Sequence, residues 1–164
     1  KLNAANIFGY SMGGFVALYL AAQKPNLIAR IATLATKFDW TLESATKEAA
    51  MLNPKTIQEK VPQFAKDLQQ RHGETWETLL NKTATMMQEM AAVPLLNAEV
   101  LQTIECPVLL GIGDNDKMVS LDETRNVFAS LSKANMYMLP NTKHPLEGVN
   151  VTLLAEILTS FYNA

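Results

Sequence analysis

The sequence has only one cysteine, two histidines and almost no excess charge. Cys106 cannot form a disulfide within the chain, and its place before Pro107 and an apolar run predicts a small buried side chain. One unpaired cysteine fits a reducing compartment, and we expect a cytoplasmic protein. Fourteen basic and sixteen acidic side chains give a net charge of -2, which leaves no positive surplus for binding nucleic acid.

The sequence also lacks a long apolar run. The stretch from Phe15 to Ala22 is far shorter than the roughly 20 residues that cross a bilayer, so no membrane span is expected. With 48% hydrophobic and 18% charged residues, the composition of the 164-residue chain is that of a globular protein with a sizeable core. No metal-ligand cluster, phosphate loop or dinucleotide fingerprint is visible, and we expect neither a metal nor a cofactor.

Short apolar runs followed by helical patterns occupy the two ends of the sequence. The helices are expected from Met12 to Ala22, from Ser120 to about Leu131, and after Asn150. Ser120 and Glu123 have the spacing of a capping box, and Asn150 is expected to cap the last helix. Strand followed by helix is typical of α/β proteins, so the sequence predicts a parallel sheet of about four strands with flanking helices. The four predicted strands are residues 5–10, 27–34, 107–112 and 135–139.

The middle of the sequence is polar and helix-forming, without a good strand. We expect three or four short helices between residues 37 and 103, and therefore a core made of residues 1–36 and 104–164 with a helical insertion, 37–103. Thr56 and Glu59 have the spacing of a capping box, and Pro62 suits the first turn of a helix that ends near Gly73. A longer helix is predicted to place one face inward: Trp76, Leu79, Leu80, Thr83, Met87 and Met90.

The pattern Gly-x-Ser-x-Gly lies where the first predicted strand becomes the first helix. Its residues are Gly9, Tyr10, Ser11, Met12 and Gly13, followed by a further glycine. A serine in a tight strand-to-helix turn needs neighbours without Cβ atoms, which we expect at Gly9 and Gly13. The turn predicts an exposed nucleophilic Ser11, with the Met12 N–H at the helix start as an oxyanion donor.

A serine hydroxyl needs a base, and histidine held by a carboxylate is the usual one. His144 follows the last predicted strand, so it and Ser11 fall at the carboxyl edge of the sheet, where α/β enzymes place their sites. His72 ends a predicted helix in the insertion, where contact with the last carbonyls explains it better. We therefore expect His144 to be the base.

The loop after the third predicted strand supplies two candidates for the acid, Asp114 and Asp116. Both follow a buried strand at the same edge as Ser11 and His144. Their spacing alone does not separate them, and Asp114 could equally be a turn residue that bonds its own backbone.

These motifs resemble the α/β-hydrolase fold family, in its branch of lidded serine hydrolases. The order serine, aspartate, histidine along the chain is the order that this family uses. In the family pattern Gly-x-x-Asp, here residues 113–116, the last position holds the triad acid, so the resemblance favours Asp116 over Asp114. It also implies that residues 37–103 form a cap and that the four strands correspond to the fifth through eighth of the family.

Family members have four further strands before the serine turn, and a loop there supplies the second oxyanion donor. The sequence contains no such strands and does not begin with Met. The resemblance therefore implies the C-terminal part of a longer hydrolase or a chain whose other half lies elsewhere, in preference to an intact minimal hydrolase. This chain alone is expected to be a poor catalyst, because losing one donor costs about 3 kcal/mol. The first strand would then be an exposed edge, which we expect to be available for self-association.

Together the residues predict a serine hydrolase of the carboxylesterase-like class, EC 3.1.1, that acts on an ester, thioester or related small acyl substrate. Ser11, His144 and Asp116 would form the triad, with Met12 at the oxyanion. A second hypothesis is a non-catalytic, hydrolase-like binding or interaction protein, or an inactive fragment. Some aromatic and methionine side chains are candidates for an apolar substrate pocket, although each fits a packed core as well: Tyr10, Trp40, Trp76, Met87 and Met90.

Overall fold

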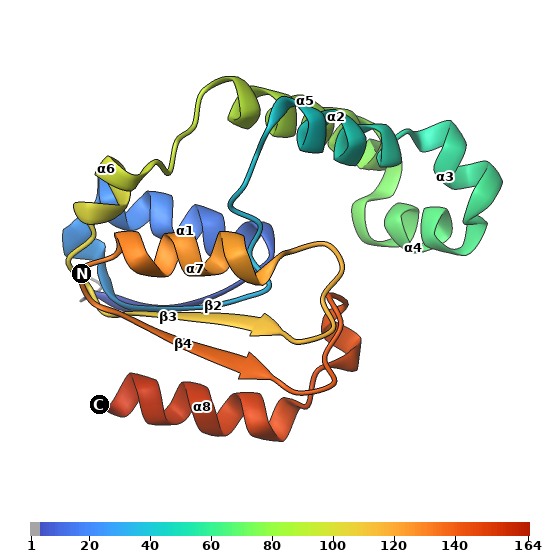
Figure 1. Cartoon of the computed structure of the whole chain (residues 1–164). Coiled ribbons are helices and arrows are strands. Elements are labelled where there is room, and N and C mark those ends of the chain that lie inside the picture. Colours follow the sequence, from blue (N-terminus) through green and yellow to red (C-terminus); the bar gives the residue numbers. More distant parts are fainter. Residues whose placement is uncertain (1–3) are drawn as a thin grey trace. The chain divides into compact units, whose positions relative to one another are not determined.

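The computed structural model describes residues 4–164, and a parallel sheet organises the larger part of them. The four strands lie side by side in sequence order, and each neighbouring pair is parallel (Figure 1). The predicted α/β class with about four parallel strands is therefore confirmed. The strands are β1 (Ala5–Tyr10), β2 (Ile28–Leu34), β3 (Val108–Gly113) and β4 (Ala134–Leu139).

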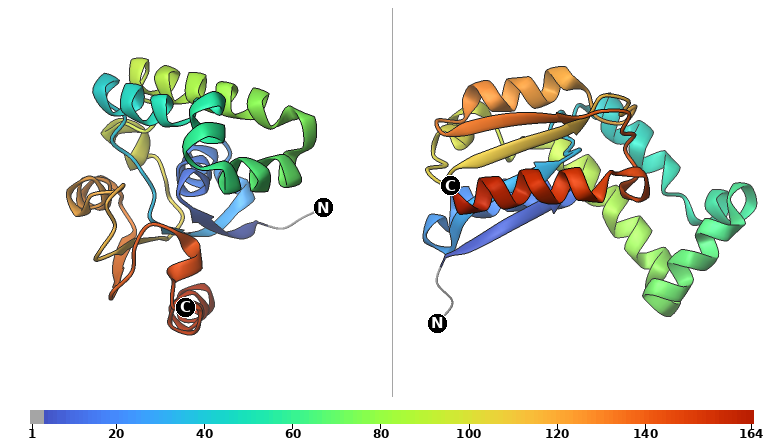
Figure 2. Two further views of the ribbon diagram at one scale, coloured as in Figure 1. Left: turned by 90° about the vertical axis from the view of Figure 1, so that its right-hand side faces the viewer. Right: turned by 90° about the horizontal axis from the view of Figure 1, so that it is seen from below.

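Helices cover both faces of the sheet, as parallel strands require, because each connection must return to the starting end. The end-on view in Figure 2 shows α1 and α8 on opposite sides of the sheet. One face carries α1 (Met12–Gln23), α7 (Leu121–Ser130) and the short α6 (Ala98–Gln102), and the other carries α8 (Val151–Asn163) (Figure 1). Two 3₁₀ turns complete this part: η1 (Pro25–Leu27) and η3 (Leu146–Gly148).

Each face of the sheet has its own apolar cluster. Leu18 of α1 packs with Ile31 and Leu110 on one side, and these side chains are fully buried. On the α8 side, Leu34 packs with Leu139. All residues of β3 are buried, which explains why its sequence is a continuous apolar run rather than an alternating one.

The strand β1 lies at one edge of the sheet and pairs with β2. The N–H of Ser11 extends this ladder by donating to the Leu34 carbonyl at 2.9 Å. Since the N–H and C=O groups of successive residues alternate in direction along a strand, those of Phe8 and Tyr10 point away from β2. The Phe8 residue is also 38% exposed to solvent. Self-association through this edge stays a prediction.

Two helices of this part begin with the side-chain caps that their sequences predict. Ser120 Oγ accepts from the Glu123 N–H at 3.1 Å while Glu123 Oε1 accepts from the Ser120 N–H at 2.6 Å, so the capping box before α7 is confirmed. Asn150 Oδ1 accepts from the Leu153 N–H at 3.1 Å and begins α8.

The rest of the chain forms a second compact unit, residues 39–94, whose core contains Ile57, Ala65, Trp76 and Leu80. The sheet unit contains the residues up to 38 and from 95 onward, α6 included. No helix in the described part of the chain is long and apolar enough to span a membrane. The second unit consists of α2 (Leu42–Met51), α3 (Pro54–Lys60), α4 (Pro62–His72), η2 (Gly73–Thr75) and α5 (Trp76–Ala92).

The predicted capping box of Thr56 and Glu59 is wrong. The helix α3 begins earlier, at Pro54, and its cap is Asn53, whose Oδ1 accepts from the Thr56 N–H at 3.0 Å. Asparagine followed by proline at the first helical position was the signal that decides this start. The predicted helix from Pro62 to the residue before Gly73 is confirmed.

The predicted inward face of α5 is only partly correct. Trp76, Leu80 and Met90 are buried. Leu79 is 40% exposed, because it lies at the margin of the helical stripe that these three residues define.

Candidate active site

Ser11 forms the turn between β1 and α1 in an unusual backbone conformation. Its φ of 50° and ψ of -122° lie where residues with a Cβ atom are rarely found, at a cost of order 1–3 kcal/mol. Besides the bond to Leu34, the Ser11 carbonyl accepts from the Gly14 N–H at 3.1 Å, which holds the turn. A serine before a helix usually caps it, but the Ser11 side chain makes no cap bond. Its hydroxyl is therefore free for another partner.

The glycines around Ser11 differ in how much room they have. A Cβ at Gly9 would lie 2.5 Å from the Gly14 backbone, and a Cβ at Gly14 would overlap Thr36 Oγ1. At Gly13, by contrast, a Cβ would meet nothing within 4 Å. The expectation that the turn requires a glycine is correct for Gly9 and wrong for Gly13, and the sequence reasoning missed Gly14. The crowding comes from packing of α1 against the end of β2, which spacing along the chain does not reveal.

His144 reaches Ser11 from the opposite edge of the sheet. It lies in the His144 loop (residues 140–148), which follows β4, whereas Ser11 follows β1 at the opposite edge. The His144 Nε2 is 3.2 Å from Ser11 Oγ, at hydrogen-bonding distance. The loop therefore spans the carboxyl edge of the sheet to reach the serine.

Asp116 holds the other nitrogen of the same imidazole. The His144 Nδ1–H donates to Asp116 Oδ2 at 2.9 Å. The second oxygen, Oδ1, accepts from the N–H groups of Met118 (2.8 Å) and Val119 (2.9 Å). The Asp116 side chain is only 1% exposed, so its carboxylate is both desolvated and fully bonded. A proton fixed on Nδ1 leaves Nε2 free to accept the serine proton.

Asp114, the other acidic candidate, bonds the backbone instead. Its Oδ1 accepts from the Thr142 N–H at 3.0 Å and from the Asn115 side-chain amide at 3.1 Å. Hydrogen bonds from the backbone of Asn141 and then Thr142 lower the pKa of Asp114. Asp114 thus holds the first part of the His144 loop at Thr142, whereas Asp116 bonds the imidazole.

Tyr10, a candidate for the substrate pocket, makes a contact that the sequence did not predict. Its hydroxyl donates to the His144 main-chain carbonyl at 2.7 Å, and its ring centroid lies 5.5 Å from that of the imidazole. Burial, followed by the negative charges of Glu147 and Asp116, raises the pKa of Tyr10, so the hydroxyl keeps its proton.

The other predicted site residues belong to the helical unit, residues 39–94. Trp76 and Met90 are buried in that unit, while Trp40 and Met87 are partly buried. His72 is exposed in the last turn of α4, as expected for a histidine near helix carbonyls. A role for these residues in a substrate pocket stays a prediction.

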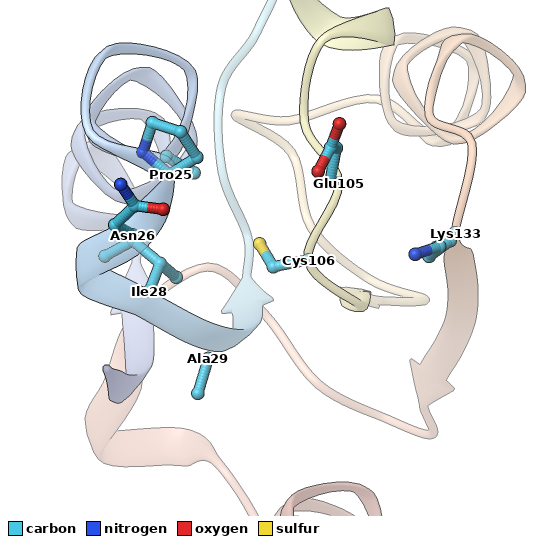
Figure 3. Close-up of a pocket in the computed structure, with 8 residues that line it drawn as sticks. Pro25, Asn26, Ile28, Ala29, Glu105, Cys106 and Lys133 are labelled. Atoms are coloured by element: carbon cyan, nitrogen blue, oxygen red, sulfur yellow. The ribbon is translucent and has the colours of Figure 1, made fainter. Parts of the chain in front are cut away.

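The opposite end of the sheet holds a pocket of about 240 Å³, drawn in Figure 3. This is smaller than the roughly 300 Å³ at which ligand sites begin. Cys106 is half-buried there, and burial raises its pKa, which keeps the thiol protonated. Within residues 4–164, no group of three or more histidine, cysteine or acidic side chains is placed to hold a metal. The pocket is lined by Ala21, Pro25, Asn26, Ile28, Ala29, Glu105, Cys106 and Lys133.

The sequence of residues 1–70 matches the family model of the α/β hydrolase fold. No curated protein matches the sequence. Similar solved structures include NosK from Streptomyces actuosus, with 18% identity and a TM-score of 0.80 over 98% of this chain and 69% of that one. A 2-hydroxy-6-oxo-6-phenylhexa-2,4-dienoate hydrolase from a Rhodococcus species has 18% identity and a TM-score of 0.73 over 99% and 65% of the two chains.

A thermophilic esterase from Thermogutta terrifontis is similar over 98% of this chain and 65% of its own, with 16% identity and a TM-score of 0.71. The chain described here has the α/β-hydrolase fold. It spans 66% of a hydrolase from a deep-sea metagenome library and 61% of a putative lipase from Acinetobacter baumannii, which is less than two thirds of either protein.

Proposed function

We propose that this chain carries the nucleophile, base and acid of a serine hydrolase that cleaves an ester, thioester or related acyl compound. One observation carries the proposal: a continuous set of hydrogen bonds leads from Ser11 Oγ to His144 (3.2 Å) and from His144 to Asp116 (2.9 Å). The parts come from loops after three different strands, so their meeting at one edge is a property of the fold. That arrangement fits acyl transfer through a serine.

In this proposal, Ser11 Oγ attacks the acyl carbon while His144 Nε2 takes the hydroxyl proton. Asp116 holds the imidazole and stabilises its positive charge. Collapse of the tetrahedral intermediate breaks the bond to the leaving group, which receives the proton from His144, and leaves an acyl-Ser11 ester. His144 then takes a proton from a water molecule, whose oxygen attacks the same carbon. The bond between this carbon and Ser11 Oγ breaks, the acid is released, and His144 returns the proton to Ser11 Oγ.

Met12 is proposed as a donor to the oxyanion. It is the first residue of α1, and the first N–H groups of a helix have no acceptor within the helix. These N–H groups point toward the Ser11 turn, and they form the positive end of the helix dipole. One such donor contributes about 10²- to 10³-fold to the rate of acyl transfer.

The comparisons support the hydrolase class rather than a particular substrate. Two of the similar proteins are named as a thermophilic esterase and as a 2-hydroxy-6-oxo-6-phenylhexa-2,4-dienoate hydrolase. A nucleophilic serine and an acyl-enzyme intermediate suit ester hydrolysis. We favour the carboxylesterase-like reaction because it needs only the groups that meet at Ser11.

We infer that the helical unit serves as a cap. Several of its large apolar side chains are exposed: Leu42, Met51, Phe64, Leu79 and Val93. Exposed apolar side chains of this kind are able to contact an apolar acyl group. We therefore expect kcat/KM on 4-nitrophenyl esters to rise from acetate to hexanoate, and a constant or falling series would contradict the inference.

Labelling with a fluorophosphonate probe tests the proposed function directly. We expect one probe per chain on wild-type protein and none on Ser11→Ala. Cys106→Ala is the matched control, because it removes the nucleophilic atom at the other end of the sheet and should leave labelling unchanged. Folded wild-type protein that takes up no probe would instead favour a non-catalytic binding protein.

A further inference from the structure

The His144 loop and the side chains of His144 and Ser11 together bridge the width of the sheet. Four strands side by side place β1 and β4 three strand spacings apart, about 14 Å. His144 follows Leu139, the last residue of β4, by five positions, and five extended residues reach at most about 17 Å. The side chains of His144 and Ser11 cover part of this span, so the position of the imidazole depends on what holds the loop near His144.

The first part of this loop, at Thr142, is held by the segment that follows β3. Asp114 Oδ1 accepts from the Thr142 N–H, and the Asn115 N–H donates to the Thr142 carbonyl at 3.0 Å. Both bonds act at Thr142, two positions before His144. They fix the loop beside β3 and β4 but do not bring the imidazole to Ser11.

The far end of the loop is held by Tyr10. The hydroxyl donates to the His144 carbonyl at 2.7 Å. The ring also lies beside the imidazole, tilted by 42°. Because Tyr10 directly precedes Ser11, these contacts connect the loop to the same turn that carries the serine.

We propose that Tyr10 is a positioning residue that sets the distance between the His144 imidazole and the Ser11 hydroxyl. This inference rests on the proposed function and gives Tyr10 a role other than lining a substrate pocket. Tyr10 touches no reacting atom in this role. It acts through the backbone of His144, while Asp116 acts through the ring.

Tyr10→Phe tests this role, because it keeps the ring and removes only the hydroxyl. Tyr162→Phe is a matched control: the Tyr162 hydroxyl also donates to a main-chain carbonyl at 2.7 Å, that of Ile7, on the same strand but away from the site. Three measurements apply to both variants: hydrogen–deuterium exchange of residues 143–148, the rate of fluorophosphonate labelling, and kcat and KM on 4-nitrophenyl acetate.

For Tyr10→Phe we expect faster exchange in the loop, with labelling and kcat about 3- to 10-fold lower and KM unchanged, as the loss of one hydrogen bond predicts. Tyr162→Phe should leave all three measurements at the wild-type level. The proposal is overturned if exchange and labelling in Tyr10→Phe match wild type, or if both variants change alike. Altered exchange in Tyr10→Phe with no labelling of wild type would keep the loop contact and reject the proposed function.

Discussion

The two ends of the sheet each carry a nucleophilic atom, yet they differ in how their surroundings are organised. At the carboxyl end, the Ser11 hydroxyl is within hydrogen-bonding distance of an imidazole whose other nitrogen is bonded to a carboxylate. At the amino end, the Cys106 thiol lies in a small pocket with Glu105 and Lys133 (Figure 3). Burial raises the pKa of this thiol and keeps it in its unreactive form.

The difference shows that a reactive atom and nearby charges do not make a site. Charged side chains are present at both ends, but at the carboxyl end both oxygens of the Asp116 carboxylate are bonded, Oδ2 by the His144 ring and Oδ1 by the N–H groups of Met118 and Val119. The loops there follow successive parallel strands, so residues far apart in sequence arrive at one edge. The amino end has no comparable set of bonds among the residues that line its pocket.

The largest contrast is expected between carboxylates. Asp116→Asn should lower kcat on 4-nitrophenyl acetate about 10³- to 10⁴-fold, because the amide no longer fixes the proton on His144 Nδ1. Asp114→Asn keeps an acceptor for the Thr142 N–H and should cost less than about 10-fold. Glu105→Gln, at the amino end, should leave kcat unchanged. A larger loss in Asp114→Asn than in Asp116→Asn would reverse the assignment of the acid.

A second contrast concerns the backbone beneath each nucleophile. Gly9→Ala should lower the free energy of unfolding by about 4 kcal/mol or more, because its Cβ would meet the Gly14 backbone, which cannot move aside. Cys106→Ala at the other end should cost about 1 kcal/mol. Urea unfolding followed by circular dichroism measures both. Gly13→Ala, with open space at its Cβ, is the control within the turn, and equal losses at Gly9 and Gly13 would contradict the packing described.

The smallest expected effect is the pH dependence that Asp114 contributes. Backbone hydrogen bonds lower its pKa in the folded protein, so the carboxylate stabilises the fold above its unfolded pKa of about 3.9. This contribution is lost as the pH falls through the lower, folded pKa. The difference in unfolding free energy between wild type and Asp114→Asn should therefore be present at pH 7 and shrink toward pH 3. A difference that stays constant over this range would argue against these bonds.

The strands, the serine turn and the capping box at Ser120 could be read from the sequence, because each depends on residues a few positions apart. The start of α3 was placed wrongly for the same reason: several residues near it can cap a helix, and the choice of Asn53 depends on Pro54 beside it. Local rules therefore gave the elements but not every boundary.

The contacts within the candidate site could be predicted from the sequence only in part. Spacing could not separate Asp114 from Asp116, since both follow β3, and only the resemblance favoured Asp116. The contact between Tyr10 and His144 joins residues 134 positions apart, and no local pattern predicts it. The crowding of Gly14 by Thr36 likewise arises from packing between an α-helix and a strand end.

Site-mapped labelling with a fluorophosphonate probe tests the central claim, that His144 makes Ser11 a nucleophile. The rate of probe attachment to the peptide containing Ser11 is measured by mass spectrometry in wild type, His144→Ala and His72→Ala. We predict attachment at Ser11 in wild type and His72→Ala at the same rate, and at least about a 10³-fold slower rate in His144→Ala. Attachment at another residue, or equal rates in both histidine variants, would contradict the account.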